Sequence, residues 1–229
     1  METHFDNIWE EEIYSQGRNI ARYPYDNIVS FIYRNYPKDK NRNEIRILEV
    51  GCGTGNNLWF ASKEGFSVTG IEGSETAVEY AKKRFEAEGL NGEFITGDFT
   101  KLPFSDNSFD LVFDRGAIVC VNFEGGNKAC REVHRVLKPG GKFFFNPYSD
   151  KHTSFESGER RNDGLVINIQ EGTLKAVGGL CFYGRQDIEK ALGTHWHIHH
   201  LKHKEHQDLT SSLVSIHAEW EIIAEKLNS

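Results

Sequence analysis

Three glycines within five residues, Gly51-x-Gly53-x-Gly55, constrain the fold of this chain more than any other feature of its sequence. The residues before them, 45–50, are apolar and rich in β-branched side chains, which predicts a buried strand. The residues after them, 56–64, place apolar side chains where a helix could face a sheet. Glycine suits the turn because a side chain would obstruct either the turn or a ligand pressed against the backbone. The helix start also offers free N–H groups to a polar ligand.

The spacing of the glycines distinguishes two kinds of ligand. A dinucleotide fingerprint, Gly-x-Gly-x-x-Gly, requires a glycine at position 56, where the chain has Asn56. The loop is instead preceded by Glu49, and a carboxylate there suits a ligand with an ammonium group better than a pyrophosphate. A nicotinamide oxidoreductase is therefore disfavoured. The same loop could also be a glycine-rich turn that binds nothing.

Size and charge exclude several classes of protein. At 229 residues, with 38% hydrophobic and 27% charged residues, the chain fits one soluble globular domain, with or without an elaboration. A net charge of −7 without a basic run argues against nucleic acid as a partner. The apolar runs are too short to span a bilayer, and the N-terminal residues lack the apolar core of a signal peptide. We expect a cytoplasmic protein with no membrane partner, either a monomer or a homodimer.

Acidic residues end the next two predicted strands. The second strand, 66–71, leads to Glu72, about 20 residues after the first glycine, where a carboxylate can accept hydrogen bonds from both ribose hydroxyls of an adenosine. The third strand, within 92–99, closes on Asp98 and Phe99, an acceptor and an aromatic wall of the kind that adenine needs. Taken alone, Asp98 could equally be a turn residue after a strand.

Together these residues resemble the class I S-adenosylmethionine-dependent methyltransferases of the small-molecule type. Glu-x-Gly-x-Gly-x-Gly is similar to the family's first motif, and Leu-Pro-Phe-x-Asp-x-Ser-Phe-Asp at 102–110 and Arg-Val-Leu-Lys-Pro-Gly-Gly at 135–141 are similar to later ones. The likeness is close over 45–146. It implies an α/β, Rossmann-like doubly wound sheet of seven mostly parallel strands with an antiparallel last strand. It also implies helices on both faces and a hairpin elaboration after the fifth strand.

The resemblance implies S-adenosylmethionine as the cofactor and S-adenosylhomocysteine as the product. Glu72 would hold the ribose, and Asp98 with Phe99 the adenine. The sequence Phe-Asp-Arg-Gly at 113–116 resembles methyltransferases of the thiopurine type. That resemblance implies that Asp114 or Arg115 touches the substrate or the methionine end of the cofactor. Alternatively, the two residues form only a salt bridge at the end of the strand. The cofactor-binding residues expected in this way are Glu49, Gly51, Cys52, Gly53, Gly55, Asn56, Asn57, Glu72, Gly73, Asp98, Phe99 and Asp114.

The chain divides into an N-terminal helical or lid segment, 1–44, and a methyltransferase domain, 45–229, in which 147–184 form a loop and hairpin elaboration. In the resembling family, N-terminal extensions commonly close over cofactor and substrate. Candidates for the lid and for substrate contact are therefore Tyr14, Arg22 and Tyr23, together with Arg115. A surface segment packed by its own aromatic side chains explains the same N-terminal residues equally well.

Local signals predict the remaining elements. Ser74 predicts a helix N-cap. Residues 165–169 and 173–177 flank Glu171-Gly172, which predicts a hairpin. Alternating stretches at 195–203 and 214–222 predict the last two strands.

No residue identifies itself as a catalytic base. A sulfonium already activates its methyl group, so positioning supplies most of the acceleration, although an oxygen nucleophile can also need a base. Candidates for a base by residue type are His152, Asp114 and the C-terminal histidines. Arg115 joins Asp114 and His152 as a candidate catalytic residue. Seven of the ten histidines lie between 195 and 217, yet no Cys-x-x-Cys or carboxylate pair accompanies them, so we expect no metal site.

The function expected from these residues is methyl transfer from S-adenosylmethionine to an oxygen, nitrogen or sulfur nucleophile of a small molecule, by in-line displacement. Alternatives are a methyltransferase acting on protein or RNA, and a non-catalytic cofactor-sensing domain of the same fold. The intact glycines together with Glu72 and Asp98 argue against the sensing domain, because a site that no longer functions has no physical need to keep all of these residues. The acceptor and the methylated atom stay open.

Overall fold

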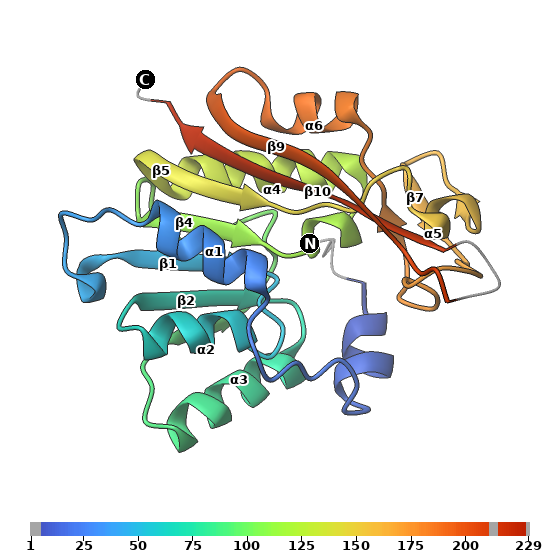
Figure 1. Ribbon diagram of the computed structural model, residues 1–229. Coiled ribbons are helices and arrows are strands. Elements are labelled where there is room, and N and C mark those ends of the chain that lie inside the picture. Colours follow the sequence, from blue (N-terminus) through green and yellow to red (C-terminus); the bar gives the residue numbers. More distant parts are fainter. Residues whose placement is uncertain (1–5, 211–214, 228–229) are drawn as a thin grey trace.

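The computed structural model describes residues 6–210 and 215–227. They form a seven-stranded sheet in the order β3-β2-β1-β4-β5-β10-β9 (Figure 1). Its strands are β1 (Arg46–Val50), β2 (Ser67–Glu72), β3 (Glu93–Thr96), β4 (Phe109–Asp114), β5 (Leu137–Phe145), β9 (Trp196–Gln207) and β10 (Ile216–Lys226). The strands from β3 to β5 pair in parallel, and β10 runs antiparallel to β5 and β9. The expected mostly parallel sheet with a reversed last strand is confirmed.

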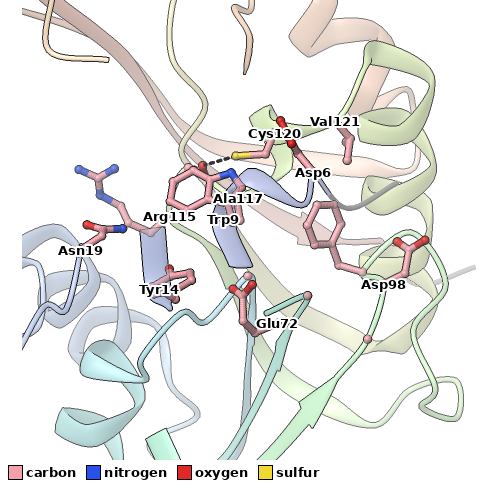
Figure 2. Close-up of a pocket in the computed structure, with 15 residues that line it drawn as sticks. Asp6, Trp9, Tyr14, Asn19, Glu72, Asp98, Arg115, Ala117, Cys120 and Val121 are labelled. Atoms are coloured by element: carbon pink, nitrogen blue, oxygen red, sulfur yellow. Dashed lines mark hydrogen bonds between the residues drawn. The ribbon is translucent and has the colours of Figure 1, made fainter. Parts of the chain in front are cut away.

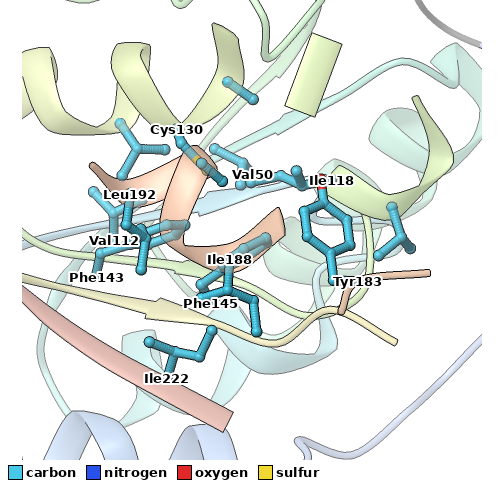
Figure 3. Packing of buried hydrophobic residues seen from close by; sticks show 14 of the residues in the cluster. Val50, Val112, Ile118, Cys130, Phe143, Phe145, Tyr183, Ile188, Leu192 and Ile222 are labelled. Atoms are coloured by element: carbon cyan, nitrogen blue, oxygen red, sulfur yellow. The ribbon is translucent and has the colours of Figure 1, made fainter. Parts of the chain in front are cut away.

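Helices cover both faces of the sheet. Against one face lie α1 (Asp26–Asn35), α2 (Asn56–Lys63) and α3 (Glu75–Ala87), and against the other lie α4 (Phe123–Val136) and α6 (Arg185–Leu192). Successive strand residues point to opposite faces, so Ile47 of β1 packs with the first set and Leu48 with the second. Figure 3 shows the second cluster, where Phe143 and Phe145 of the sheet meet Cys130 of α4 and Leu192 of α6. Burial on both faces explains why these strands are nearly all apolar.

Short helical turns complete the chain. They are η1 (Trp9–Tyr14), η2 (Arg42–Glu44), η3 (Ile118–Cys120) and α5 (Thr153–Glu156). The predicted N-cap at Ser74 is confirmed, because its Oγ accepts a hydrogen bond of 3.1 Å from the Ala77 N–H at the start of α3. β3 ends at Thr96, so Asp98 and Phe99 lie in the turn that follows the strand.

The expected hairpin elaboration after β5 is confirmed, but its strands differ from those predicted. A small antiparallel sheet joins β6 (Glu159–Arg160), β7 (Leu165–Ile167) and β8 (Leu180–Cys181), and the predicted strand at 173–177 is wrong. Those residues form a turn instead, because the side chain of Ser154 ties them to α5. Its Oγ donates to the Glu171 carbonyl and accepts from the Leu174 N–H. The second strand that pairs with β7 is therefore β8, Leu180–Cys181, and not residues 173–177.

The hairpin of β9 and β10 reaches beyond the carboxyl end of β5. There the β10 backbone pairs with the segment after β5: the Trp220 N–H donates to Pro147, and the Ser149 N–H donates to Ala218. β10 ends at Lys226, four residues past the predicted end at 222 (226 − 222), while Val214, where that strand was predicted to begin, lies outside the described residues. This pairing brings β10 side chains to the sheet edge where β1, β2 and β4 also end.

Residues 6–210 and 215–227 contain neither a candidate membrane span nor a cluster of metal ligands. None of the helices there has the length and apolar character needed to cross a membrane. In the same residues, no group of three or more His, Cys, Asp or Glu side chains is placed to hold a metal ion.

Candidate active site

A pocket opens at the carboxyl ends of β1, β2, β3 and β4, beneath the N-terminal segment. Figure 2 shows Trp9 and Tyr14 of that segment together with Glu72 and Asp98 from the sheet side around the same pocket. The lining residues are Asp6, Trp9, Tyr14, Asn19, Gly51, Glu72, Gly73, Gly97, Asp98, Phe99, Arg115, Gly116, Ala117, Cys120 and Val121. Open α/β sheets place their ligands at this edge.

The glycine loop leaves no room for side chains. Gly51 has φ +67°, and a Cβ there would lie 2.0 Å from the Ala117 Cβ. Gly53 has φ +49°, and a Cβ there would lie 2.7 Å from the Tyr14 hydroxyl. Both positions therefore require glycine for conformation and for space. The loop exposes bare backbone where Gly51 lines the pocket.

Glu72 is held in place by backbone donors on two elements. Its Oε2 accepts the Gly53 N–H at 3.0 Å, and its Oε1 accepts the Ser74 N–H at 2.9 Å. Burial raises the pKa of Glu72, and these N–H groups act in the opposite direction. An ionised carboxylate offers about four lone-pair sites, so each oxygen can accept one more hydrogen bond. Glu72 is thus oriented and still able to bind two hydroxyl groups.

Asp98 and Phe99 lie in the turn after β3 and line the same pocket. Asp98 Oδ1 accepts the Thr100 N–H at 2.7 Å, which fixes the orientation of the carboxylate. Asp98 is therefore a turn residue and a pocket residue at once. Phe99 is half-buried and packs against the core beneath α4.

Two buried carboxylates stand behind the loop without lining the pocket. Glu49 Oε1 accepts the Asn57 amide at 2.7 Å, and Asp114 Oδ1 accepts the Ala117 and Ile118 N–H groups at 2.8 and 2.9 Å. The second oxygen of each, Glu49 Oε2 and Asp114 Oδ2, has no hydrogen-bond partner among the described residues. Burial raises the pKa of Glu49 well above its usual value and that of Asp114 to about 6.

The asparagines at the start of α2 hold the N-terminal segment. Asn57 Oδ1 accepts the Tyr25 N–H at 3.0 Å, and Asn56 donates to the Tyr23 carbonyl at 2.8 Å. Neither lines the pocket, nor do Cys52, Gly53 and Gly55 of the glycine loop. Of the twelve residues expected to bind the cofactor, the pocket lining includes Gly51, Glu72, Gly73, Asp98 and Phe99.

Of the three lid candidates in the N-terminal segment, only Tyr14 reaches the pocket. Tyr14 is buried and lines the pocket, and burial raises the pKa of its hydroxyl. Arg22 and Tyr23 are exposed, and Tyr23 packs edge-on against Trp59 outside the pocket. Glu10 fixes the segment, since its carboxylate accepts hydrogen bonds from Ser74 and Thr76 at the start of α3.

Several pocket residues were not predicted from the sequence. Asp6, Trp9 and Asn19 belong to the N-terminal segment, and its richness in aromatic residues was the only available signal, which applies to Trp9. Cys120 and Val121 follow the fourth strand in an apolar run that resembles ordinary core.

Arg115 reaches across the end of the sheet to β10. Its Nη2 lies 3.7 Å from Glu219 Oε2, and its guanidinium lies 4.4 Å from the centre of the Tyr25 ring. The ionic neighbour of Arg115 is therefore Glu219, which was not predicted. Asp114 instead binds backbone N–H groups of its own turn.

His152 lies away from the pocket. Its Nδ1 accepts the Ser154 N–H at 3.0 Å, and its Nε2 lies 3.1 Å from His217 Nδ1. Burial lowers the pKa of His152 to about 4. The imidazole caps α5, and the pocket lining does not include it.

Comparisons with known proteins agree with this geometry. Residues 47–141 match the family model of a methyltransferase domain, so the resemblance of the glycine loop to class I methyltransferases is confirmed. A sterol 24-C-methyltransferase of Gibberella zeae is 43% identical over 103 residues, which are 43% of this chain and 26% of that protein. A phthiotriol/phenolphthiotriol dimycocerosates methyltransferase of Mycobacterium tuberculosis is 36% identical over 107 residues, 46% of this chain and 37% of that protein.

A solved structure extends the likeness of fold to most of the chain. An S-adenosylmethionine-dependent methyltransferase of Methanosarcina mazei superposes with a TM-score of 0.71 at 23% identity. The superposition covers 86% of this chain and 98% of that one. The chain thus spans well under half the length of the two curated relatives but has the whole fold of this structural neighbour.

Proposed function

We propose that this chain, which carries a class I methyltransferase domain over residues 47–141, transfers the methyl group of S-adenosylmethionine to a small molecule. The observation that carries the proposal is the convergence of three strand ends on one pocket. Backbone at Gly51, the oriented carboxylate of Glu72 and the pair Asp98 and Phe99 all line it. An adenosine needs this set: close backbone approach, an acceptor for its ribose, and an acceptor beside an aromatic wall for its base.

The unsatisfied carboxylates fit the other end of the cofactor. Glu49 Oε2 and Asp114 Oδ2 are buried without partners among the described residues, and an unpaired buried carboxylate is costly. A ligand with an ammonium group would offset that cost at the end of β1 and β4. Glu72 would hold the ribose, Asp98 the adenine amine, and Glu49 or Asp114 the methionine end.

The bound cofactor would supply an activated methyl group. The chain would then need to hold the acceptor in line with that group and to keep water away. Trp9 and Tyr14 cover the pocket and would exclude water, with Glu10 fastening their segment to α3. Arg115 and Gly116 lie where the acceptor would enter.

A small-molecule acceptor fits this covered pocket better than a folded protein or RNA. The N-terminal segment lies over the pocket mouth, and the net charge of −7 disfavours a polyanion. The two curated relatives are named for sterol and for phthiotriol or phenolphthiotriol dimycocerosate substrates, which are also small molecules.

Calorimetric titration with S-adenosylhomocysteine, S-adenosylmethionine and NAD tests the proposal. The first two should bind, NAD should not, and Glu72→Ala should abolish binding while the protein remains folded. Failure of S-adenosylhomocysteine to bind would refute the proposal. Radiolabelled methyl transfer in a metabolite extract should then label the small-molecule fraction. Label in protein or RNA would favour the macromolecular alternative, and binding without any labelled product would favour the cofactor-sensing domain.

A further inference from the structure

Arg115 and Glu219 face each other beside the pocket with unused hydrogen-bonding capacity. Their closest atoms are 3.7 Å apart, beyond the range of a good hydrogen bond. Arg115 Nε and Glu219 Oε2 are both buried without a hydrogen-bond partner among the described residues. Only 17% of the Arg115 side chain and 8% of the Glu219 side chain are exposed. An unused buried donor and an unused buried acceptor within one ion pair indicate a missing partner.

Both groups are held charged by their surroundings. Burial acts to raise the pKa of Glu219, but His217, whose Nε2 lies 3.7 Å away, and Arg115 together bring that pKa below its usual value. Burial acts against the charge of Arg115, yet Tyr148, Glu219 and Tyr25 together raise its pKa. The pair therefore presents a cation and an anion side by side.

Aromatic rings and a glycine shape the space around this pair. The Arg115 guanidinium stacks over the Tyr25 ring, and a Cβ on Gly116 would lie 3.3 Å from the Tyr148 hydroxyl. Arg115 and Gly116 also line the pocket, which connects the pair to the cofactor side. The pair is thus bordered by the Tyr25 ring and the Tyr148 hydroxyl, and Arg115 belongs both to the pair and to the pocket lining.

We infer that Arg115 and Glu219 form the acceptor subsite and select an uncharged acceptor that carries a hydrogen-bond donor and a hydrogen-bond acceptor side by side, as a carboxamide or lactam edge does. Such a group accepts from Arg115 Nε–H and donates to Glu219 Oε2, so both unused atoms gain a partner. This inference rests on the proposed function, because it names the substrate class of the same site.

Charged acceptors fit the pair less well. A carboxylate or phosphate would be attracted by Arg115 but repelled by Glu219, and it has no proton to donate to Glu219 Oε2. A cationic amidinium or ammonium group would be attracted by Glu219 but repelled by Arg115, and it offers no acceptor to the Arg115 Nε–H. Inside a buried site such like-charge contacts weigh more than they do in water.

Three planar probes of the same shape separate these possibilities: benzamide, benzoate and benzamidine. Binding of each to the protein saturated with S-adenosylhomocysteine is measured by saturation-transfer NMR titration. Benzamide should bind the unmodified protein at least about tenfold more tightly than either charged probe, the ratio expected when a charge-assisted hydrogen bond is lost. Equal binding of the three probes would overturn the inference.

Two variants locate the selection. Glu219→Gln should reverse the preference between benzamide and benzoate, because the repelling charge is gone. Arg115→Met should improve benzamidine relative to benzoate. Glu225→Gln, on the same strand but paired with His199, is the matched control and should leave the three affinities unchanged.

The outcomes separate the inference from the function on which it rests. If S-adenosylhomocysteine does not bind, the proposed function fails first. If it binds but the probe preferences are the same in the unmodified protein and in Glu219→Gln, only the acceptor subsite is refuted. Melting curves of each variant with S-adenosylhomocysteine identify any variant that has lost its fold. If a variant is unfolded, the preference of the unmodified protein for benzamide over the two charged probes decides the question.

Discussion

The Gly53 N–H donates a 3.0 Å hydrogen bond to the Glu72 carboxylate, which ties the loop after β1 to the end of β2. This hydrogen bond couples the position of the glycine-loop backbone to the position of the Glu72 carboxylate, and both are expected to contact the ligand. A change in the loop should consequently disturb both. This coupling makes the glycine loop the most direct place to test the site.

Gly53→Val should weaken S-adenosylhomocysteine binding at least about tenfold with the fold retained. Its Cβ would lie 2.7 Å from the Tyr14 hydroxyl, so the substitution displaces Tyr14 from the pocket. Calorimetric titration gives the affinity. Gly140→Ala is the control, because Gly140 also has positive φ (+75°) but has open space around it. If both variants bind equally well, the close approach at Gly53 does not matter.

Cofactor binding should release protons near pH 6. Burial raises the pKa of Glu49, Glu72 and Asp114, so some of these carboxyl groups are protonated in the ligand-free protein. A bound cation favours their ionised forms and expels the protons. Titration in two buffers of different ionisation enthalpy counts them. Proton uptake, or no change, would contradict the proposed place of the ammonium group.

Asp114→Asn should raise the stability of the ligand-free protein at pH 7. Burial raises the Asp114 pKa from 3.8 to about 6, so ionisation increasingly penalises the folded state as pH rises from 3.8 through about 6. At about 1.4 kcal/mol per pKa unit the penalty is about 3 kcal/mol above that range. Asparagine keeps the acceptor for Ala117 and Ile118 without the charge. Melting temperatures should differ at pH 7 and converge towards pH 4.

Glu10→Gln should loosen the N-terminal segment. The Glu10 carboxylate accepts hydrogen bonds at the start of α3, where a negative charge is favourable, and such a contact is worth about 0.5–2 kcal/mol. Burial opposes the ionised form, but bonds from Ser74 and Thr76 lower the Glu10 pKa below 4.5. Its stabilisation is therefore present above pH 4.5 and lost as pH falls through the lowered value. Hydrogen exchange over residues 6–19 should be faster in the variant at pH 7.

His152→Gln should change the pH dependence of stability without changing cofactor affinity. Burial lowers the His152 pKa from 6.5 to about 4, so stability is present above pH 6.5 and is lost as pH falls towards 4. Glutamine removes that titration. Melting curves from pH 7 to pH 4 should fall less steeply for the variant. A loss of S-adenosylhomocysteine binding would place His152 nearer the site than the structure does.

Much of the fold could be predicted because local and global signals agree in it. Local features favour the same structure as the whole sheet does: the glycine loop a tight turn, Ser74 a helix start, and the apolar segments buried strands. The strand at 173–177 was wrong because its alternation competes with a contact that sequence does not display. Ser154 Oγ, about 20 residues earlier, holds the turn after Gly172.

The site was harder to predict than the fold. Glu72, Asp98 and Phe99 stand next to strand ends, where position along the chain indicates position in space. Glu219 has no such signal, because its approach to Arg115 depends on the register between β10 and β5. Arg22 and Tyr23 fit the lid pattern by residue type, yet the path of the backbone turns them to the surface.

The long antiparallel strand β10 has a further consequence. Ile222 in the middle of the strand is locked into the hydrophobic interior, and three residues earlier Glu219 stands beside Arg115. A slip of one residue in its pairing would exchange the sides of Glu219 and Trp220, placing an indole where the carboxylate belongs. The same slip would also turn Ile222 out of the interior, so the packing of the core holds the register that sets Glu219 beside Arg115.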